Sequence, residues 1–143
     1  MKMKYKDIGS FEFQNLMQTI RAAKTSNVNA CMINGVWKQV KAAREQIMNE
    51  YTKEVMEVYA VRNEDGTIKS PEGQQQGFTP IPEKTEEFTK AQDAFGEKEY
   101  DFTYGPFKPS HLADVKLSAK DIETLGVLFD EKAGPAMPVG VGF

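Results

Sequence analysis

"MKMKYK" at residues 1–6 and "EYDFTY" at residues 99–104 decide the fold of this chain. In the first stretch, Met1, Met3 and Tyr5 alternate with three lysines, so apolar and charged side chains fall on opposite faces of an extended segment. Strict alternation of this kind predicts a half-buried β-strand.

The second stretch alternates in the same way but carries the opposite charge. Its aromatic face holds Tyr100, Phe102 and Tyr104, and its polar face holds two carboxylates. Each lysine–carboxylate pair across two strands contributes only about 0.2–1 kcal/mol, yet the complementary charge favours this pairing over a like-charged neighbour. The sequence therefore predicts that residues 1–6 and 99–104 meet in one small sheet.

Helical signals fill most of the remaining chain. Ser10 and Ser118 are placed to cap the first turns of two helices, and Asp121 completes a capping box with Ser118. Pro82 suits the first position of another helix. We therefore predict helices at residues 10–24, 28–61, 82–95 and 118–130. The expected fold class is α+β, with a helical hairpin and two further helices around a small, mainly antiparallel sheet.

The predicted helix at 28–61 carries an apolar stripe with a period close to 3.6 residues. The stripe consists of Ile33, Val36, Val40, Ile47, Tyr51, Val55 and Val58, with Trp37 and Met48 beside it. Such a stripe packs against a core or a partner, so we expect its side chains to be buried. Gly35 weakens the helix by up to about 1 kcal/mol relative to alanine, which is typical of a kink or a close backbone contact. Gly35 and Trp37 are therefore candidate partner-binding residues.

The charges are unevenly distributed along the 143 residues. Residues 1–44 carry eight basic and two acidic side chains, residues 45–143 carry ten basic and nineteen acidic ones, and the formal net charge is −3. This balance argues against a nucleic-acid binder, for which a strongly basic domain is expected. It suits self-complementary packing or separate surfaces for different protein partners.

Residues with catalytic or metal-binding chemistry are sparse. Cys31 is the single cysteine and His111 the single histidine, which excludes an internal disulfide framework and a zinc site. Ser110 precedes His111 directly, and adjacent residues do not supply the geometry of a nucleophile and its base. We predict no catalytic residues, no cofactor, no metal and no enzymatic activity, with Cys31 as a small buried hydrophobic residue.

No leader or membrane segment is indicated. The basic start "MKMKYKDIG" lacks the apolar region of a signal peptide. The chain has no uninterrupted apolar run of membrane-spanning length. We expect a protein that is made in a cytoplasm and stays there or is packaged from it.

Four short pieces follow a helical pair in a fixed order: a turn at Asn63–Gly66, a helix at Pro82–Phe95, an acidic-aromatic strand at Glu99–Phe102 and a closing helix at Ser118–Leu125. This order resembles a group of small tailed-bacteriophage proteins of unassigned function, over about Met1–Glu131. That group has a "DEDG"-type turn, a lysine- and glutamate-rich helix, an acidic-aromatic strand and an "S-x-x-D-L-x-x-L" helix.

The resemblance implies a function without catalysis. It points to a structural or accessory protein that docks onto other virion proteins. The alternative is a small intracellular phage effector that binds and inhibits a host protein. The expected location is accordingly the virion or the host cytoplasm, and the expected partners are other protein subunits in a homo- or hetero-oligomeric assembly.

The stretch "AGPAMPVGVGF" at residues 133–143 carries no charge and departs from the pattern of that phage group. We expect a single α+β domain over residues 1–132 and a C-terminal arm over residues 133–143. The candidate partner-binding residues of the arm are Met137, Val139, Val141 and Phe143. They either dock onto a neighbouring subunit, with the last three sharing one face of an extended chain, or fold back onto their own domain.

Overall fold

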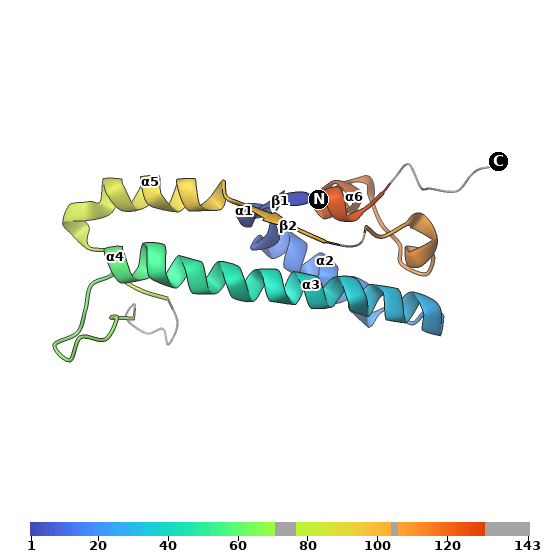
Figure 1. The fold of residues 1–143 in the computed structure, drawn as a ribbon, viewed down its shortest axis with the longest axis horizontal. Coiled ribbons are helices and arrows are strands. Elements are labelled where there is room, and N and C mark those ends of the chain that lie inside the picture. The colour runs from blue at the N-terminus through green and yellow to red at the C-terminus, as the bar shows by residue number, and fades with distance from the viewer. Residues whose placement is uncertain (71–76, 104–105, 131–143) are drawn as a thin grey trace.

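Figure 1 shows the fold in a computed structural model that describes residues 1–70, 77–103 and 106–130. It is mostly helical with one small sheet, an α+β arrangement. The strands are β1 (Lys2–Lys4) and β2 (Glu99–Asp101), and the helices are α1 (Tyr5–Ile8), α2 (Phe11–Ala22), α3 (Asn27–Tyr51), α4 (Glu57–Tyr59), α5 (Thr85–Gly96) and α6 (Ala119–Leu125). A π-helical turn covers Thr52–Met56, and 3₁₀ turns cover Pro82–Lys84, Pro109–Leu112 and Gly126–Leu128.

The two strands pair antiparallel, as their complementary charges predict. The register places Met3 opposite Tyr100 and a lysine opposite a carboxylate on each side of that pair. Both strands are shorter than predicted, and Tyr5 begins helix α1, although its N–H still donates to the Lys98 carbonyl at 2.7 Å. The extended pattern ends there because Tyr5 and Ile8 are both buried, and residues three apart share a face in a helix.

Serine caps fix where the helices begin. The Ser10 hydroxyl accepts a hydrogen bond from the Phe13 N–H at 3.2 Å at the start of α2. Ser118 and Asp121 each accept a bond from the other's backbone N–H at 3.0 Å at the start of α6, so the predicted capping box is confirmed. Ser26 caps α3 in the same way.

Helix α3 runs along most of the molecule, and helices α2 and α5 pack along it (Figure 1). Helix α2 packs antiparallel against it, because Arg44 donates to Gln14 Oε1 at 2.9 Å while Arg21 stacks over the Trp37 ring at 4.2 Å. Helix α5 lies alongside its C-terminal end and the π-helical turn (Figure 1). The predicted helical hairpin is thus confirmed, and the predicted helix over residues 28–61 is a rod that ends at Tyr59.

Two clusters of buried side chains hold these elements together. The larger consists of Met3, Ile8, Phe13, Leu16, Met17, Ile20, Ile33, Val36, Val40, Ala43, Phe102, Phe107, Leu112, Leu125 and Leu128. The smaller consists of Tyr5, Val55 and Phe95, and it joins α1 and α5 to the C-terminal part of the long helix. Both clusters combine the first residues of the chain with residues beyond 94, because Met3 packs with Phe102 in the larger cluster and Tyr5 with Phe95 in the smaller. Detaching the N-terminal segment would therefore expose buried side chains of both clusters.

The apolar stripe of the long helix is only partly buried. Met48 and Val58 are 60% and 47% exposed, so the prediction of burial is wrong for these two residues. The π-helical turn accounts for Val58, since the Glu57 N–H bonds to the Thr52 carbonyl five residues back. This wider turn shifts the 3.6-residue period on which the prediction depended.

Cys31, Gly35 and Trp37 also differ from expectation. Cys31 is exposed, so its interpretation as a buried residue is wrong; it lies two positions from the buried Ile33, which places it on the opposite side of the helix. Helix α3 continues through Gly35, where an added Cβ would meet no described atom within 4 Å, so the chain's own packing does not explain this glycine. Trp37 is half-buried. The predicted arm at 133–143 lies outside the described residues.

Candidate functional site

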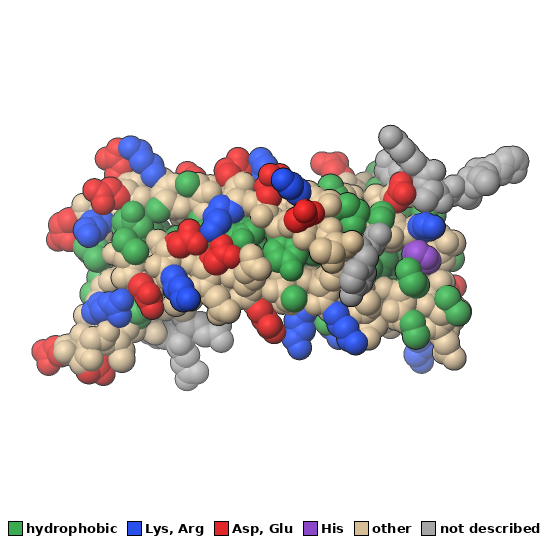
Figure 2. Space-filling model, viewed as in Figure 1, with side chains coloured by type: hydrophobic (Ala, Val, Ile, Leu, Met, Phe, Trp, Pro, Cys, Tyr) green, Lys and Arg blue, Asp and Glu red, His purple; other side chains and the backbone are tan. Residues whose placement is uncertain are grey.

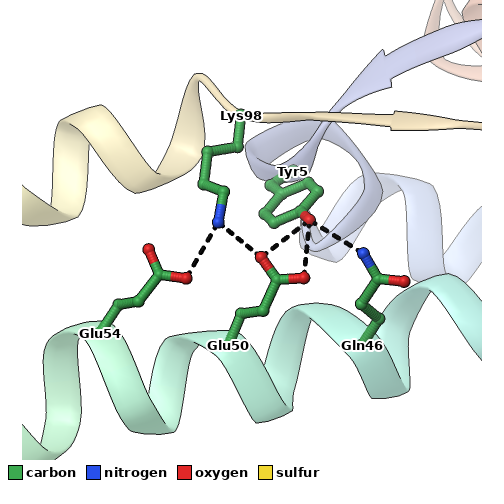
Figure 3. Close-up of polar contacts among 5 residues, drawn as sticks. All are labelled: Tyr5, Gln46, Glu50, Glu54 and Lys98. Atoms are coloured by element: carbon green, nitrogen blue, oxygen red, sulfur yellow. Dashed lines mark hydrogen bonds and ion pairs between the residues drawn. The ribbon is translucent and has the colours of Figure 1, made fainter.

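A polar network ties the N-terminal segment to α3 (Figure 3). Tyr5 donates its hydroxyl hydrogen to the Glu50 carboxylate, whose two oxygens both lie at 3.1 Å, and Gln46 donates to the same hydroxyl at 3.2 Å. Lys98 follows α5 and donates to Glu50 Oε1 at 2.5 Å and to Glu54 Oε2 at 2.9 Å. Three segments that are distant in sequence are thus joined on one face of the helix.

Three groups of this network, Tyr5, Glu50 and Lys98, have shifted pKa values. The hydrogen bond with Lys98 lowers the pKa of Glu50, and the same bond raises the pKa of Lys98. Burial raises the pKa of the Tyr5 hydroxyl. A general acid or base works best with a pKa near the working pH, whereas these three shifts run away from pH 7. Because its hydrogen bonds join α1, α3 and the segment after α5, we call the network the Tyr5–Glu50–Lys98 clamp.

Aromatic rings extend the clamp along the contact between α3 and α5. Phe95 packs edge-on against Tyr5 and Tyr51, with ring centroids 5.3 and 5.2 Å away. The Tyr51 hydroxyl donates to Gln92 Oε1 at 3.2 Å, and burial raises its pKa. These contacts set the spacing of the two helices and leave a hollow beside them.

That hollow is a groove made of two adjoining cavities. The first has a volume of about 600 Å³, and its apolar lining comes from Tyr5, Ile47, Met48, Tyr51 and Phe95. The second has a volume of about 390 Å³ and is lined by Trp37, Lys41, Arg44 and Glu45 together with Ile47 and Met48. Because the cavities share Gly9, Ile47 and Met48, we treat them as one surface, the α3 groove.

The α3 groove has the character of a recognition surface. Its surface is apolar around Ile47 and Met48, and charged side chains also line both cavities, Lys41, Arg44 and Glu45 in the second and Lys6, Asp93 and Glu97 in the first. Met48 lines both cavities and is exposed, and a flexible thioether adapts well to the shape of a partner. Concave, mainly apolar surfaces with a few polar groups are typical of binding sites.

Charged side chains do not single out another site on the face shown in Figure 2. Lysine, arginine and carboxylate side chains are interspersed there over both α5 and α3. Among the described ion pairs, Lys4 and Lys6 both reach Glu97 at 3.1 Å, and Lys90 reaches Glu86 at 3.5 Å. Such exposed pairs each contribute about 1 kcal/mol or less, so they are typical of a solvated surface.

The structure separates the two predicted partner-binding residues that it describes. Trp37 lines the α3 groove. Gly35 lies on the other flank of α3, where helical spacing places it near the exposed Val28 and Met32. The remaining candidates, Met137, Val139, Val141 and Phe143, lie outside the described residues.

Sequence reasoning missed most of the groove. Tyr5 and Phe95 form its walls, but the alternation assigns Tyr5 to a strand and the helical pattern leaves Phe95 as the end of a helix. Nothing local in the sequence brings the two rings together. The available signal was Met48, a large apolar residue beside the core-facing stripe instead of on it.

His111 and Ser110, the residues considered for catalysis, take part in hydrogen bonds within the fold. His111 Nδ1 accepts the Lys108 N–H at 3.1 Å and so closes its own 3₁₀ turn. The Ser110 carbonyl accepts the Asn29 side-chain amide at 3.1 Å. Within residues 1–70, 77–103 and 106–130, no group of three or more His, Cys, Asp or Glu side chains is placed to hold a metal ion. The helices in this part of the chain also lack the combination of length and apolar character needed to cross a membrane.

Comparison with protein-family models, curated protein sequences and solved structures finds no match for the chain. The α3 groove and the order of the sequence pieces are therefore the features that bear on function.

Proposed function

We propose that the protein is a non-catalytic bacteriophage structural or accessory protein that works by docking onto other virion proteins. The observation that supports docking is the α3 groove, a concave apolar surface with the exposed Met48 where its two cavities meet. Grooves beside helices receive apolar side chains of a peptide or helix from a partner. The phage context is supported by the order of turn, helix and strand pieces in the sequence.

The Tyr5–Glu50–Lys98 clamp supports a groove that is formed before a partner binds. Tyr5 belongs to α1 and Lys98 lies two residues after the end of α5, and both side chains are hydrogen-bonded to Glu50 on α3. These three helices also supply the groove walls. A groove whose walls are already ordered costs less conformational entropy on binding than one that must form with its partner.

The test compares two glutamate substitutions in the full chain. Met48→Glu introduces a carboxylate into the groove, whereas Val58→Glu introduces one at an exposed position on α4 that does not line it. Quantitative mass spectrometry of purified particles of the phage that encodes the chain then counts copies per particle. Burying an unpaired carboxylate costs more than the roughly 1.4 kcal/mol that equals a tenfold loss, so we expect Met48→Glu to reduce incorporation at least about tenfold.

The Val58→Glu control distinguishes loss of docking from a general effect of an added carboxylate. Val58→Glu should be incorporated like the unmodified chain, and both variants should keep their thermal melting temperature. Equal incorporation of Met48→Glu would reject the groove as the docking surface. Absence of the unmodified chain from particles would reject the virion role and favour the effector that binds a host protein.

A further inference from the structure

The α3 groove has a measurable length. Its lining on α3 runs from Trp37 to Tyr51, and at about 1.5 Å per residue this stretch of helix is about 21 Å long. Ile47 and Met48 lie between these ends, and the groove is apolar around them. The groove is thus suited to an extended, uncharged segment with several apolar side chains in a row.

The chain contains one stretch with that length and polarity. Residues 133–143 carry no charge, and Met137, Val139, Val141 and Phe143 recur at every second position. On an extended backbone these four side chains share one face, and at about 3.3 Å per residue the first and last are about 20 Å apart. The opposite face carries Pro138, Gly140 and Gly142, which add no bulk on the solvent side.

We propose that residues 137–143 bind along the α3 groove in extended form, with their four apolar side chains against Trp37, Ile47, Met48 and Tyr51. The inference rests on the proposed function, because it takes the α3 groove as the docking surface and names residues 137–143 as the segment that binds there. The lack of charge in the segment matches the apolar middle of the groove, and its length matches the distance from Trp37 to Tyr51. When the segment comes from a neighbouring copy, the groove becomes a contact between subunits.

The test measures how well the groove is covered in the full chain. In a Cys31→Ser background, Met48→Cys puts a thiol where the two cavities meet, and Val58→Cys puts a control thiol outside the groove. Each is made with the natural C-terminal segment and with a polar segment in which Val139, Val141 and Phe143 are replaced by serine. The rate of maleimide labelling is then compared, and melting curves confirm that all variants are folded.

We expect the thiol at position 48 to react at least about tenfold more slowly with the natural segment than with the polar one, a ratio that reports the free energy of covering. The thiol at position 58 should react equally in both. Protection that disappears on dilution assigns the segment to a neighbouring copy, and protection that persists assigns it to the same copy; both outcomes support the proposal.

Two outcomes would overturn it. Equal fast labelling at position 48 means that the segment does not cover the groove, and equal slow labelling means that something else does. The proposed function is judged separately by particle incorporation. If Met48→Glu blocks incorporation while the labelling rates are equal, docking through the groove stands and residues 137–143 are not its occupant.

Discussion

Replacing Tyr5 by phenylalanine removes one hydroxyl group from the centre of the clamp and keeps the ring that packs on Phe95. That hydroxyl donates to Glu50 and accepts from Gln46, and only 4% of the residue is exposed. A hydrogen bond to a charged acceptor contributes about 1.5–3 kcal/mol. Lys98 still holds Glu50 in the variant, and Gln46 turns to water, so we expect Tyr5→Phe to cost about 1–2 kcal/mol.

The assay is urea unfolding at pH 7, followed by circular dichroism. The midpoint should fall while the slope with denaturant stays unchanged, because the variant exposes the same surface on unfolding. Tyr5→Ala serves as the reference for packing. It removes the ring as well, and loss of a buried aromatic side chain costs about 3–5 kcal/mol.

A double-mutant cycle tests whether the clamp is one unit. Tyr5→Phe and Lys98→Met both remove a hydrogen bond to Glu50, so their costs should differ from additivity by at least about 0.5 kcal/mol. A Tyr5→Phe variant as stable as the unmodified protein would refute the reasoning from burial and geometry. Additive costs would show that the two bonds to Glu50 act independently.

Two further predictions concern pH and Trp37. The pKa of Glu50 is lowered in the folded state, so this group stabilises the fold above its unfolded pKa of about 4.3, and the stabilisation is lost as the pH falls through the folded pKa. The pKa of Lys98 is raised, so this group stabilises the fold below its unfolded pKa of about 10.4, and the stabilisation is lost as the pH rises through the folded pKa. The free energy of unfolding should therefore form a plateau between about pH 5 and 10 that Lys98→Met lowers, and an unchanged curve in urea melts across this range would contradict the assignment. Trp37→Ala should cost about 2 kcal/mol, less than the 3–5 typical of a fully buried aromatic residue, because the ring is half-buried. Its fluorescence should shift to longer wavelength in Arg21→Ala, which uncovers the ring, and emission that is already that of free tryptophan would contradict the stacking.

The helix starts could be predicted because they depend on residues within one turn, and the sheet could be predicted because its two strands carry opposite charges. Alternation identifies Met3, Tyr5 and Phe102 as side chains that face a core, and opposite charges select the partner strand. Ser10 and Ser118 mark helix starts because a serine oxygen can satisfy a backbone N–H one turn ahead. Neither inference needs knowledge of the rest of the fold.

The groove could not be predicted because it belongs to no single segment. Its walls come from Tyr5, from Ile47 and Met48, and from Phe95, and the sequence does not encode their spacing. The exposure of Val58 also could not be predicted from the helical periodicity of the apolar residues. A π-helical turn has no distinctive composition, so the point at which the period shifts is visible only in the structure.

The π-helical turn at Thr52–Met56 has a consequence for how the chain tolerates changes in length. Its bond from the Glu57 N–H to the Thr52 carbonyl spans one residue more than an α-helical bond. Deleting one residue within it would restore the ordinary ladder, and α4 beyond it would keep nearly its present orientation, because the wider turn already absorbs the extra residue. Deleting one residue from α3 instead would rotate the helix beyond it by about 100° around the helix axis, the angle that one residue occupies. In the second case Val55 would turn away from Tyr5 and Phe95, so the smaller buried cluster would open. The π-helical turn is therefore the place on the long helix where we expect the fold to tolerate the loss of one residue.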